Sequence, residues 1–137
     1  MTIKNPSNEI ISSILNTSKT IAVVGLSDNP DRTSYQISKA MQDAGYKIIP
    51  VNPNVKEVLG EKAYPSLSDI EEKIDIINVF RRSEHLPAIA KEAINTDCNV
   101  FWAQQGVKND EAYKILKERG FTVIMDLCIK VAQAVLV

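Results

Sequence analysis

The stretch Lys19-Thr20-Ile21-Ala22-Val23-Val24-Gly25 is a short apolar run, rich in β-branched side chains, that ends at a glycine. A run of this kind predicts a strand that is buried on both faces. On either side the apolar residues recur at helical spacing. Residues 6–16 predict an opening helix that starts at Asn5-Pro6, and residues 33–44 predict a second helix that ends at Gly45.

The same alternation of strand and helix continues to the end of the chain. Apolar runs predict four further strands, over residues 46–51, 74–80, 99–103 and 120–125. Helical spacing predicts a helix capped by Ser83, another over about residues 109–119, and a last one over about residues 127–136.

Two residue pairs have the spacing of a capping box, in which two side chains satisfy the free N–H groups at a helix start. Thr33 with Gln36 predicts the start of the second helix, and Ser68 with Glu71 predicts a short helix. The pattern over residues 55–67 is weaker and predicts only a short edge strand near Ala63-Tyr64.

Strands that are continuous apolar runs, alternating with helices, are typical of a parallel sheet with helices on both faces. We therefore expect an α/β fold, a three-layer α/β/α sandwich with a mainly parallel sheet of five or six strands. The 137 residues are close to the modal size of one domain, so residues 1–137 are expected to form a single domain.

The composition argues against several classes of protein. There are 16 Lys and Arg and 17 Asp and Glu, a formal net charge of −1 that argues against a nucleic-acid or membrane-surface protein. No apolar run approaches the roughly 18 residues of a membrane-spanning helix, and the first residues lack the apolar core of a signal peptide. Two cysteines and one histidine do not suggest a disulfide framework or a metal site, so we expect a cytoplasmic protein without metal.

Ligands of open parallel sheets bind beyond the C-terminal ends of the strands, near the point where the strand order reverses. This rule selects four loops, over residues 25–33, 52–56, 80–83 and 104–108. These loops and the helix start beside them offer many hydrogen-bond donors and few carboxylates: Ser27, Asn29, Arg32, Ser34, Asn52, Asn54, Lys56, Arg81, Arg82, Ser83, Gln104 and Gln105.

The first loop has the features of a phosphate site. Gly25 permits a close backbone approach, the helix start near Thr33 offers free N–H groups, and Arg32 adds a cation. A plain strand-to-helix turn stays open as the alternative. The dinucleotide fingerprint G-x-G-x-x-G is incomplete, because residues 25–30 keep only its first glycine, and Asn52 stands where the fingerprint requires an acidic residue. Both departures argue against NAD and leave room for a nucleotide with an additional phosphate.

Arg81-Arg82-Ser83 follows a predicted strand and precedes a helix, so its two guanidinium groups are candidates to clamp a phosphate. An exposed pair without a ligand stays open. His85 is interpreted as a packing or hydrogen-bonding residue and Cys128 as an inert thiol. No spaced pair of carboxylates suggests catalysis, so no catalytic residue is expected.

Four blocks of the sequence, in order over nearly the whole chain, resemble the small CoA-binding protein family, which is similar to the CoA-binding domain of the succinyl-CoA synthetase alpha subunit. The blocks are residues 22–27 with Pro30 and Arg32, residues 45–53, residues 75–85, and residues 102–107 with Asn109 and Glu111. The resemblance implies a Rossmann-like sheet.

The resemblance also implies a division of the CoA site among the loops. The CoA pyrophosphate would be held by the first loop, through Gly25, Ser27, Asn29, Pro30 and Arg32. The adenosine and its 3′-phosphate would meet Asn52, Pro53 and Lys56. The other side of the CoA site would be lined by Phe80, Arg81, Arg82 and Ser83. The pantetheine end would be bounded by Gln104 and Gly106.

The C-terminus departs from the family pattern, which often shows Asp-Arg-Cys followed by a Glu-His pair. This chain has Asp126-Leu127-Cys128 and then Val131-Ala132-Gln133. We expect a module that binds CoA or a short acyl-CoA and is not an enzyme, serving storage, sensing or thiol protection. An NAD(P)-linked redox enzyme, or an interaction module that has lost its ligand, are the alternatives. CoA is the expected partner, and a homodimer stays open.

Overall fold

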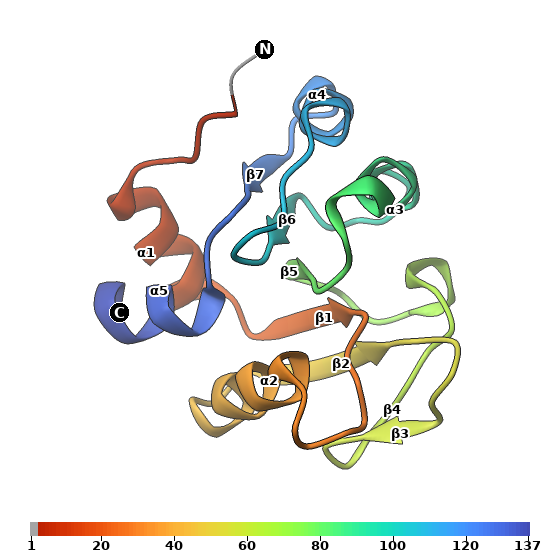
Figure 1. The fold of residues 1–137 in the computed structure, drawn as a ribbon. Helices are drawn as coiled ribbons and strands as arrows, with labels where there is room; N and C mark the ends of the chain where they lie inside the picture. Colours follow the sequence, from red (N-terminus) through yellow and green to blue (C-terminus); the bar gives the residue numbers. More distant parts are fainter. Residues whose placement is uncertain (1–2) are drawn as a thin grey trace.

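The computed structural model describes residues 3–137. Its centre is a sheet of five parallel strands in the order β2-β1-β5-β6-β7 (Figure 1). The strands are β1 (Thr20–Val24), β2 (Lys47–Val51), β5 (Ile76–Val79), β6 (Val100–Ala103) and β7 (Thr122–Ile124). The predicted α/β class and parallel sheet are confirmed, with five strands.

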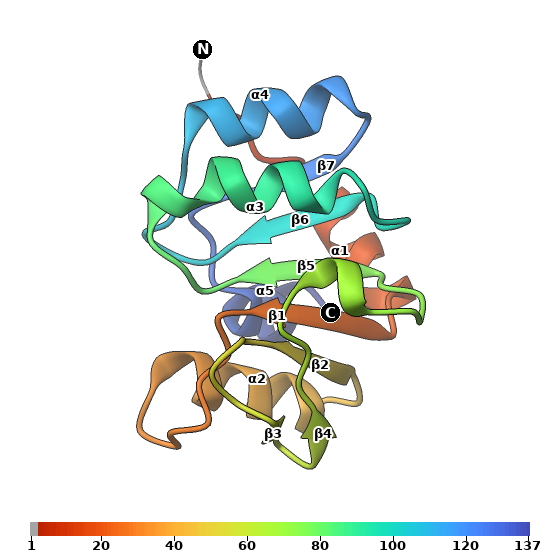
Figure 2. The same ribbon diagram turned by 90° about the vertical axis from the view of Figure 1, so that its right-hand side faces the viewer.

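Helices cover both faces of the sheet, as the three-layer prediction requires. One face carries α1, α2 and α5, and the other carries α3 and α4 (Figures 1 and 2). The helices are α1 (Asn8–Thr17), α2 (Thr33–Asp43), α3 (Leu86–Ala93), α4 (Asp110–Glu118) and α5 (Ile129–Leu136). Short 3-10 turns, η1 (Leu67–Asp69) and η2 (Ser83–His85), lie between them.

Successive residues of each strand supply opposite faces of the core. In β1, Ala22 and Val24 pack in the cluster beneath α3 and α4, whereas Ile21 and Val23 pack in the cluster beneath α1, α2 and α5. Because both sets are apolar, the strand appears in the sequence as a continuous run. Apolar burial on both faces is the main force that holds the layers together.

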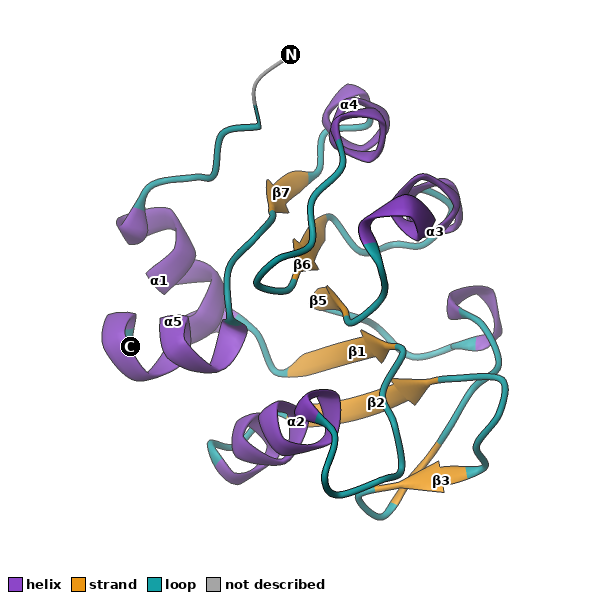
Figure 3. Ribbon diagram, viewed as in Figure 1, coloured by secondary structure: helices purple, strands orange, loops and turns teal. Residues whose placement is uncertain are grey.

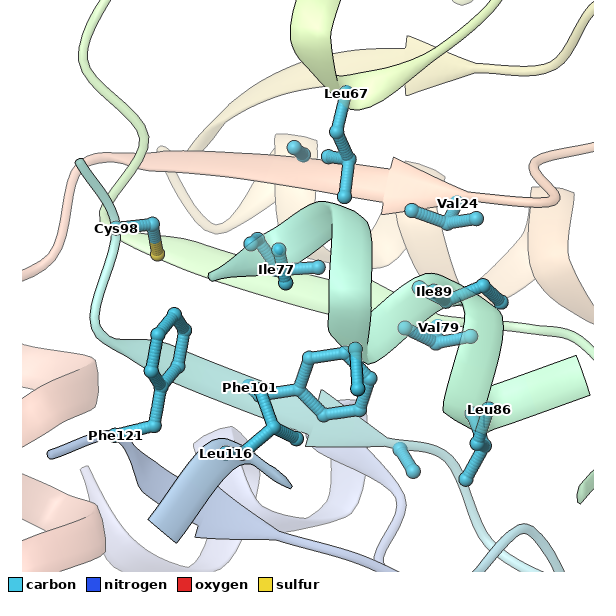
Figure 4. Close-up of a cluster of buried hydrophobic side chains, with 14 of the residues drawn as sticks. Val24, Leu67, Ile77, Val79, Leu86, Ile89, Cys98, Phe101, Leu116 and Phe121 are labelled. Atoms are coloured by element: carbon cyan, nitrogen blue, oxygen red, sulfur yellow. The ribbon is translucent and has the colours of Figure 1, made fainter. Parts of the chain in front are cut away.

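Figure 4 shows the cluster on the α3 and α4 face. Phe101 from β6 lies close to Leu116 of α4, and Phe121 lies beside them. In the opposite cluster Trp102 is fully buried, and its indole N–H donates to the Leu127 carbonyl at 2.9 Å. This bond ties β6 to the segment that leads into α5.

The predicted start of the first helix is wrong. Ser7, not Asn5-Pro6, caps α1, and its side chain accepts a hydrogen bond from the Ile10 N–H. Asn5 instead bonds with the backbone of Met125: its Nδ2 donates to the Met125 carbonyl and its Oδ1 accepts from the Met125 N–H, both at 2.9 Å. Asn5 therefore bonds to a backbone far along the chain instead of to the N–H groups of the neighbouring helix.

Two other predicted caps are also wrong. The start of α2 has no side-chain cap, and the Gln36 amide donates to the Pro30 carbonyl instead. Ser83 does not cap α3, which begins three residues later at Leu86. The Ser83 hydroxyl accepts from the Lys108 N–H at 3.1 Å, so it joins two loops of the predicted site.

Residues 55–71 differ most from the prediction. Instead of an edge strand near Ala63-Tyr64 they form a short antiparallel hairpin, β3 (Glu57–Val58) with β4 (Glu61–Lys62). Tyr64 makes only an isolated bridge, to Val51. The Ser68 and Glu71 capping box is absent, because the single turn η1 occupies this place.

The strand order reverses between β1 and β5, since the chain adds β2 on one side of β1 and then crosses to the other side. Such a reversal opens a crevice at the C-terminal ends of the two strands. In Figure 3 the arrows of β1 and β2 point to the same side, and the loops that follow them lie there.

Within residues 3–137, no helix is both long and apolar enough to span a bilayer. The exposed large hydrophobic residues are Ile10 on α1 together with Val131, Val135 and Val137 at the C-terminal end. The homodimer that the sequence leaves open stays a prediction.

Candidate functional site

A cleft of about 920 Å³ lies at the C-terminal edge of β1, β5 and β6. Four chain segments form it, and the loops that contribute to it gather at the left of Figure 2. The predicted site residues that line it are Gly25, Ser27, Arg32, Ser34, Asn52, Phe80, Arg81, Arg82, Ser83, Gln104 and Gly106. The structure therefore brings residues from all four predicted loops together.

A second, smaller cavity of about 390 Å³ adjoins this cleft. Both are lined by Gly25, Asn52 and Arg81, and Pro53 lines only the smaller one. The smaller cavity is closed by η1 and α3, where Glu92 accepts a hydrogen bond from the Leu67 N–H. Arg81, Gly25 and Asn52 therefore border both spaces.

Three predicted site residues, Asn29, Pro30 and Lys56, do not line either space. Asn29 and Pro30 form a turn closed by the Arg32 N–H on the Asn29 carbonyl at 3.0 Å. The Asn29 side chain also accepts from the Asp31 N–H. These two residues shape the first loop, and Lys56 lies exposed at the start of the β3–β4 hairpin.

Asn52 uses its side chain within the protein. Its Nδ2 donates to the Leu26 carbonyl at 3.0 Å, and its Oδ1 accepts from the Asn54 N–H at 2.9 Å. The amide thus ties the loop after β2 to the loop after β1. A carboxylate here would lose the donor to Leu26.

Gly25 marks the closest approach of two backbones in the cleft. Its φ is +88°, and a Cβ built on it would lie 2.4 Å from the Phe80 carbonyl oxygen. The Phe80 N–H in turn donates to the Val24 carbonyl at 2.9 Å. The resemblance assigned this glycine to the CoA pyrophosphate, but the approach of the Phe80 backbone by itself already requires a glycine here.

The cleft has a cationic lining. Arg32, Arg81 and Arg82 line it, and Asp31 is the one acidic side chain among its lining residues. The Arg82 guanidinium lies 4.0 Å from the Glu84 carboxylate, but both side chains are mostly exposed and this pair is weak. Three permanent cations at one opening favour an anionic ligand.

The far wall of the cleft is a tight turn over residues 104–107. The Val107 N–H donates to the Gln104 carbonyl at 2.9 Å, and Gly106 occupies the third position with φ +83°. The Gln104 side chain is buried, and its Oε1 accepts from the Ile129 N–H at 3.3 Å at the start of α5. Gln104 therefore lines the cleft and also holds the start of α5.

The single histidine and the two thiol groups do not line the cleft. His85 is exposed, and neither cavity includes it. Cys98 lies before β6, at the end of the sheet opposite the cleft, and burial raises the pKa of its thiol to about 11. Cys128 is half-buried at the start of α5. Among residues 3–137 no cluster of His, Cys, Asp or Glu has the arrangement of a metal site.

Two residues that line the larger cleft were not named as candidates, Asp31 and Val107, and two more, Thr33 and Gln105, were named but not assigned to the CoA site. Each belongs to, or directly follows, a loop that the strand-end rule had already selected. Treating each whole loop as the candidate site would have included all four.

The profile of the CoA binding domain family matches residues 19–134. The Bacillus subtilis (strain 168) protein YneT is 67% identical over 132 residues, which are 96% of this chain and 98% of that protein. An ADP-forming acetate–CoA ligase of Methanocaldococcus jannaschii is 32% identical over 74 residues, 54% of this chain but 10% of the ligase.

Solved structures agree over the whole fold. A hypothetical protein from Pyrococcus horikoshii OT3 is 34% identical, with a TM-score of 0.92 over 99% of each chain. A protein from Thermus thermophilus is 33% identical, with a TM-score of 0.92 over 96% of this chain and 100% of that one. From the family profile, the relatives and the shared fold, the chain belongs to the CoA binding domain family.

Proposed function

We propose that this protein binds CoA, as the free thiol or a short acyl thioester, and acts as a binding module rather than an enzyme. The observation that carries the proposal is the cationic cleft of about 920 Å³ at the C-terminal edge of the sheet. It lies at the reversal of strand order, where ligands of such sheets bind. Membership of the CoA binding domain family supports the choice of ligand.

The start of α2 supports the position of the CoA pyrophosphate. No side chain caps this helix, so its first N–H groups have no side-chain acceptor there. Thr33 and Ser34 of its first turn line the cleft beside Arg32. Free N–H groups, the helix dipole and a guanidinium together match a phosphate.

The size and shape of the crevice support an extended ligand. Ligand pockets generally have volumes of about 300–1,000 Å³. The cleft and the adjoining cavity of about 390 Å³ share Asn52 and Arg81. A long ligand such as CoA can therefore lie across both spaces, with its phosphates near Arg81.

Asn52 argues against the NAD(P) alternative. NAD-binding domains place an acidic residue after the second strand to bind the ribose hydroxyl groups. Here Asn52 occupies that place, and both polar atoms of its side chain already have partners within the protein. The same residue leaves no negative charge to repel an additional phosphate.

The lining groups favour binding over catalysis. Asp31 is the one Asp, Glu, His or Cys side chain that lines the larger cleft, so no acid–base pair faces a ligand there. We also propose a reducing, cytoplasmic setting, which the two unpaired cysteines support.

Calorimetric titration with CoA, acetyl-CoA, NAD and NADP at one salt concentration tests the proposal. We expect CoA to bind and NAD not to. Arg32→Ala and Arg81→Ala should each weaken CoA binding by about 1–3 kcal/mol, the scale of charge-assisted hydrogen bonds. Arg119→Ala removes the same charge at the exposed C-terminal end of α4, at the edge of the sheet opposite the cleft, and should leave the affinity unchanged.

Two results would contradict the proposal. Preference for NAD or NADP over CoA would favour the redox enzyme. Absence of binding to all four ligands would favour the interaction module. Unchanged CoA affinity in both cleft variants would remove the assignment of Arg32 and Arg81 to the phosphates.

A further inference from the structure

Asp126 has an unusual backbone conformation close to the cleft. Its φ is +58°, and Leu59 is the other non-glycine residue with positive φ within residues 3–137. This left-handed region costs an ordinary side chain about 1–2 kcal/mol. A residue keeps such a conformation where its surroundings compensate for the strain.

The compensation comes from the turn over residues 104–107. The Asp126 carboxylate accepts a hydrogen bond from the Gly106 N–H at 2.7 Å, and the Asp126 N–H donates to the Val107 carbonyl at 3.0 Å. In Figure 1 the turn after β6 lies beside the segment that joins β7 to α5. The bond from Gly106 is charge-assisted and therefore among the stronger kinds.

The segment that carries Asp126 is itself held on both sides. Asn5 binds the backbone of the preceding Met125 through two hydrogen bonds. The following Leu127 accepts the Trp102 indole N–H. Asp126 thus extends from a fixed segment and holds a turn that has no regular secondary structure of its own.

The turn that Asp126 holds contributes only uncharged side chains to the lining of the cleft. Gln104, Gln105, Gly106 and Val107 all line it, whereas the arginines belong to the other loops. CoA has its phosphates at one end and an uncharged pantetheine arm at the other. With the phosphates at the arginines, the arm meets the turn over residues 104–107.

We propose that Asp126 is a positioning residue that holds this turn in the conformation that receives the pantetheine arm, without taking part in binding the nucleotide end. The inference rests on the proposed function, because it assumes that the ligand is CoA. It assigns a role in ligand selection to a residue that does not itself line the cleft.

Two substitutions separate the hydrogen bond from the backbone strain. Asn and Gly both adopt the left-handed region readily, but only Asn keeps an acceptor for the Gly106 N–H. Each variant is titrated with CoA and with adenosine 3′,5′-bisphosphate, which lacks the pantetheine arm. We expect Asp126→Gly to weaken CoA binding about tenfold and to leave bisphosphate binding unchanged. Asp126→Asn should bind both ligands like the unaltered protein.

Equal weakening of both ligands in Asp126→Gly, or unchanged CoA affinity, would overturn the inference, since a merely structural role cannot separate the two ligands. If Asp126→Gly does not fold, hydrogen exchange of the unaltered protein tests the turn instead: CoA should slow the exchange of the Gly106 N–H and the bisphosphate should not, and equal slowing by both would overturn the inference. Failure of the unaltered protein to bind either ligand would instead contradict the proposed function, and the inference with it.

Discussion

Gly25 stands where β1 passes into the first loop of the cleft, and two separate constraints act on it. Its φ of +88° favours glycine, and a Cβ would meet the Phe80 carbonyl at 2.4 Å. Gly25→Ala should therefore lower the free energy of unfolding by about 2–4 kcal/mol, the sum of backbone strain and a clash in a packed site. Urea unfolding measures this loss.

Gly120 provides the matched control. Its φ is +79°, but a Cβ there would meet no atom within 4 Å. Gly120→Ala should cost only the strain, about 1 kcal/mol. Equal losses in the two variants would show that the approach of Phe80 to Gly25 contributes little.

At the scale of an element, α4 depends on the residue that caps its N-terminus. Asn109 caps the helix, and its Oδ1 accepts from the Ala112 N–H at 2.9 Å. Asn109→Ala should lower the free energy of unfolding by about 1 kcal/mol, whereas Asn109→Asp keeps the acceptor and should be close to neutral. Urea unfolding of the two variants compares them, and an equal loss in both would contradict the role of the cap.

At the scale of the whole molecule, stability should fall in alkaline solution. Burial raises the pKa of the Cys98 thiol from 9.0 to about 11. Between these values the unfolded chain releases a proton that the folded protein retains, so the free energy of unfolding decreases as pH rises. Burial also raises the pKa of Tyr46, which adds a decrease of the same sign at higher pH.

Urea unfolding at about pH 8 and at about pH 10.5 measures this decrease, because the interval covers most of the range between the pKa of the exposed thiol and that of the buried thiol. Cys98→Ala should show a smaller decrease than the unaltered protein. Cys128→Ala, which removes the half-buried thiol, should keep the original decrease. A pH dependence that is the same in all three proteins would contradict the assignment to Cys98.

Consecutive residues were sufficient to predict the strands and most helices. A parallel strand covered on both faces must be apolar at nearly every position, so residues 19–25 and 74–80 were recognisable without their partners. The rule that ligands bind beyond strand ends then selected four loops, and the structure brings residues of all four into one cleft.

Side chains with several available partners could not be assigned in the same way. Asn5, Gln36 and Ser83 each have the right type for a local cap, yet each bonds elsewhere. A polar side chain gains about the same from one backbone group as from another, so the packing of the chain selects between them.

The amino-acid pattern established the α/β class, the alternation of elements and the likeness to CoA-binding proteins, since these depend on residue type and local spacing. The order of the five strands, the approach of Phe80 to Gly25 and the bond between Asp126 and Gly106 depend on distant segments meeting in space. Such contacts leave no periodic signal in one chain, because the partners lie many residues apart and only packing brings them together.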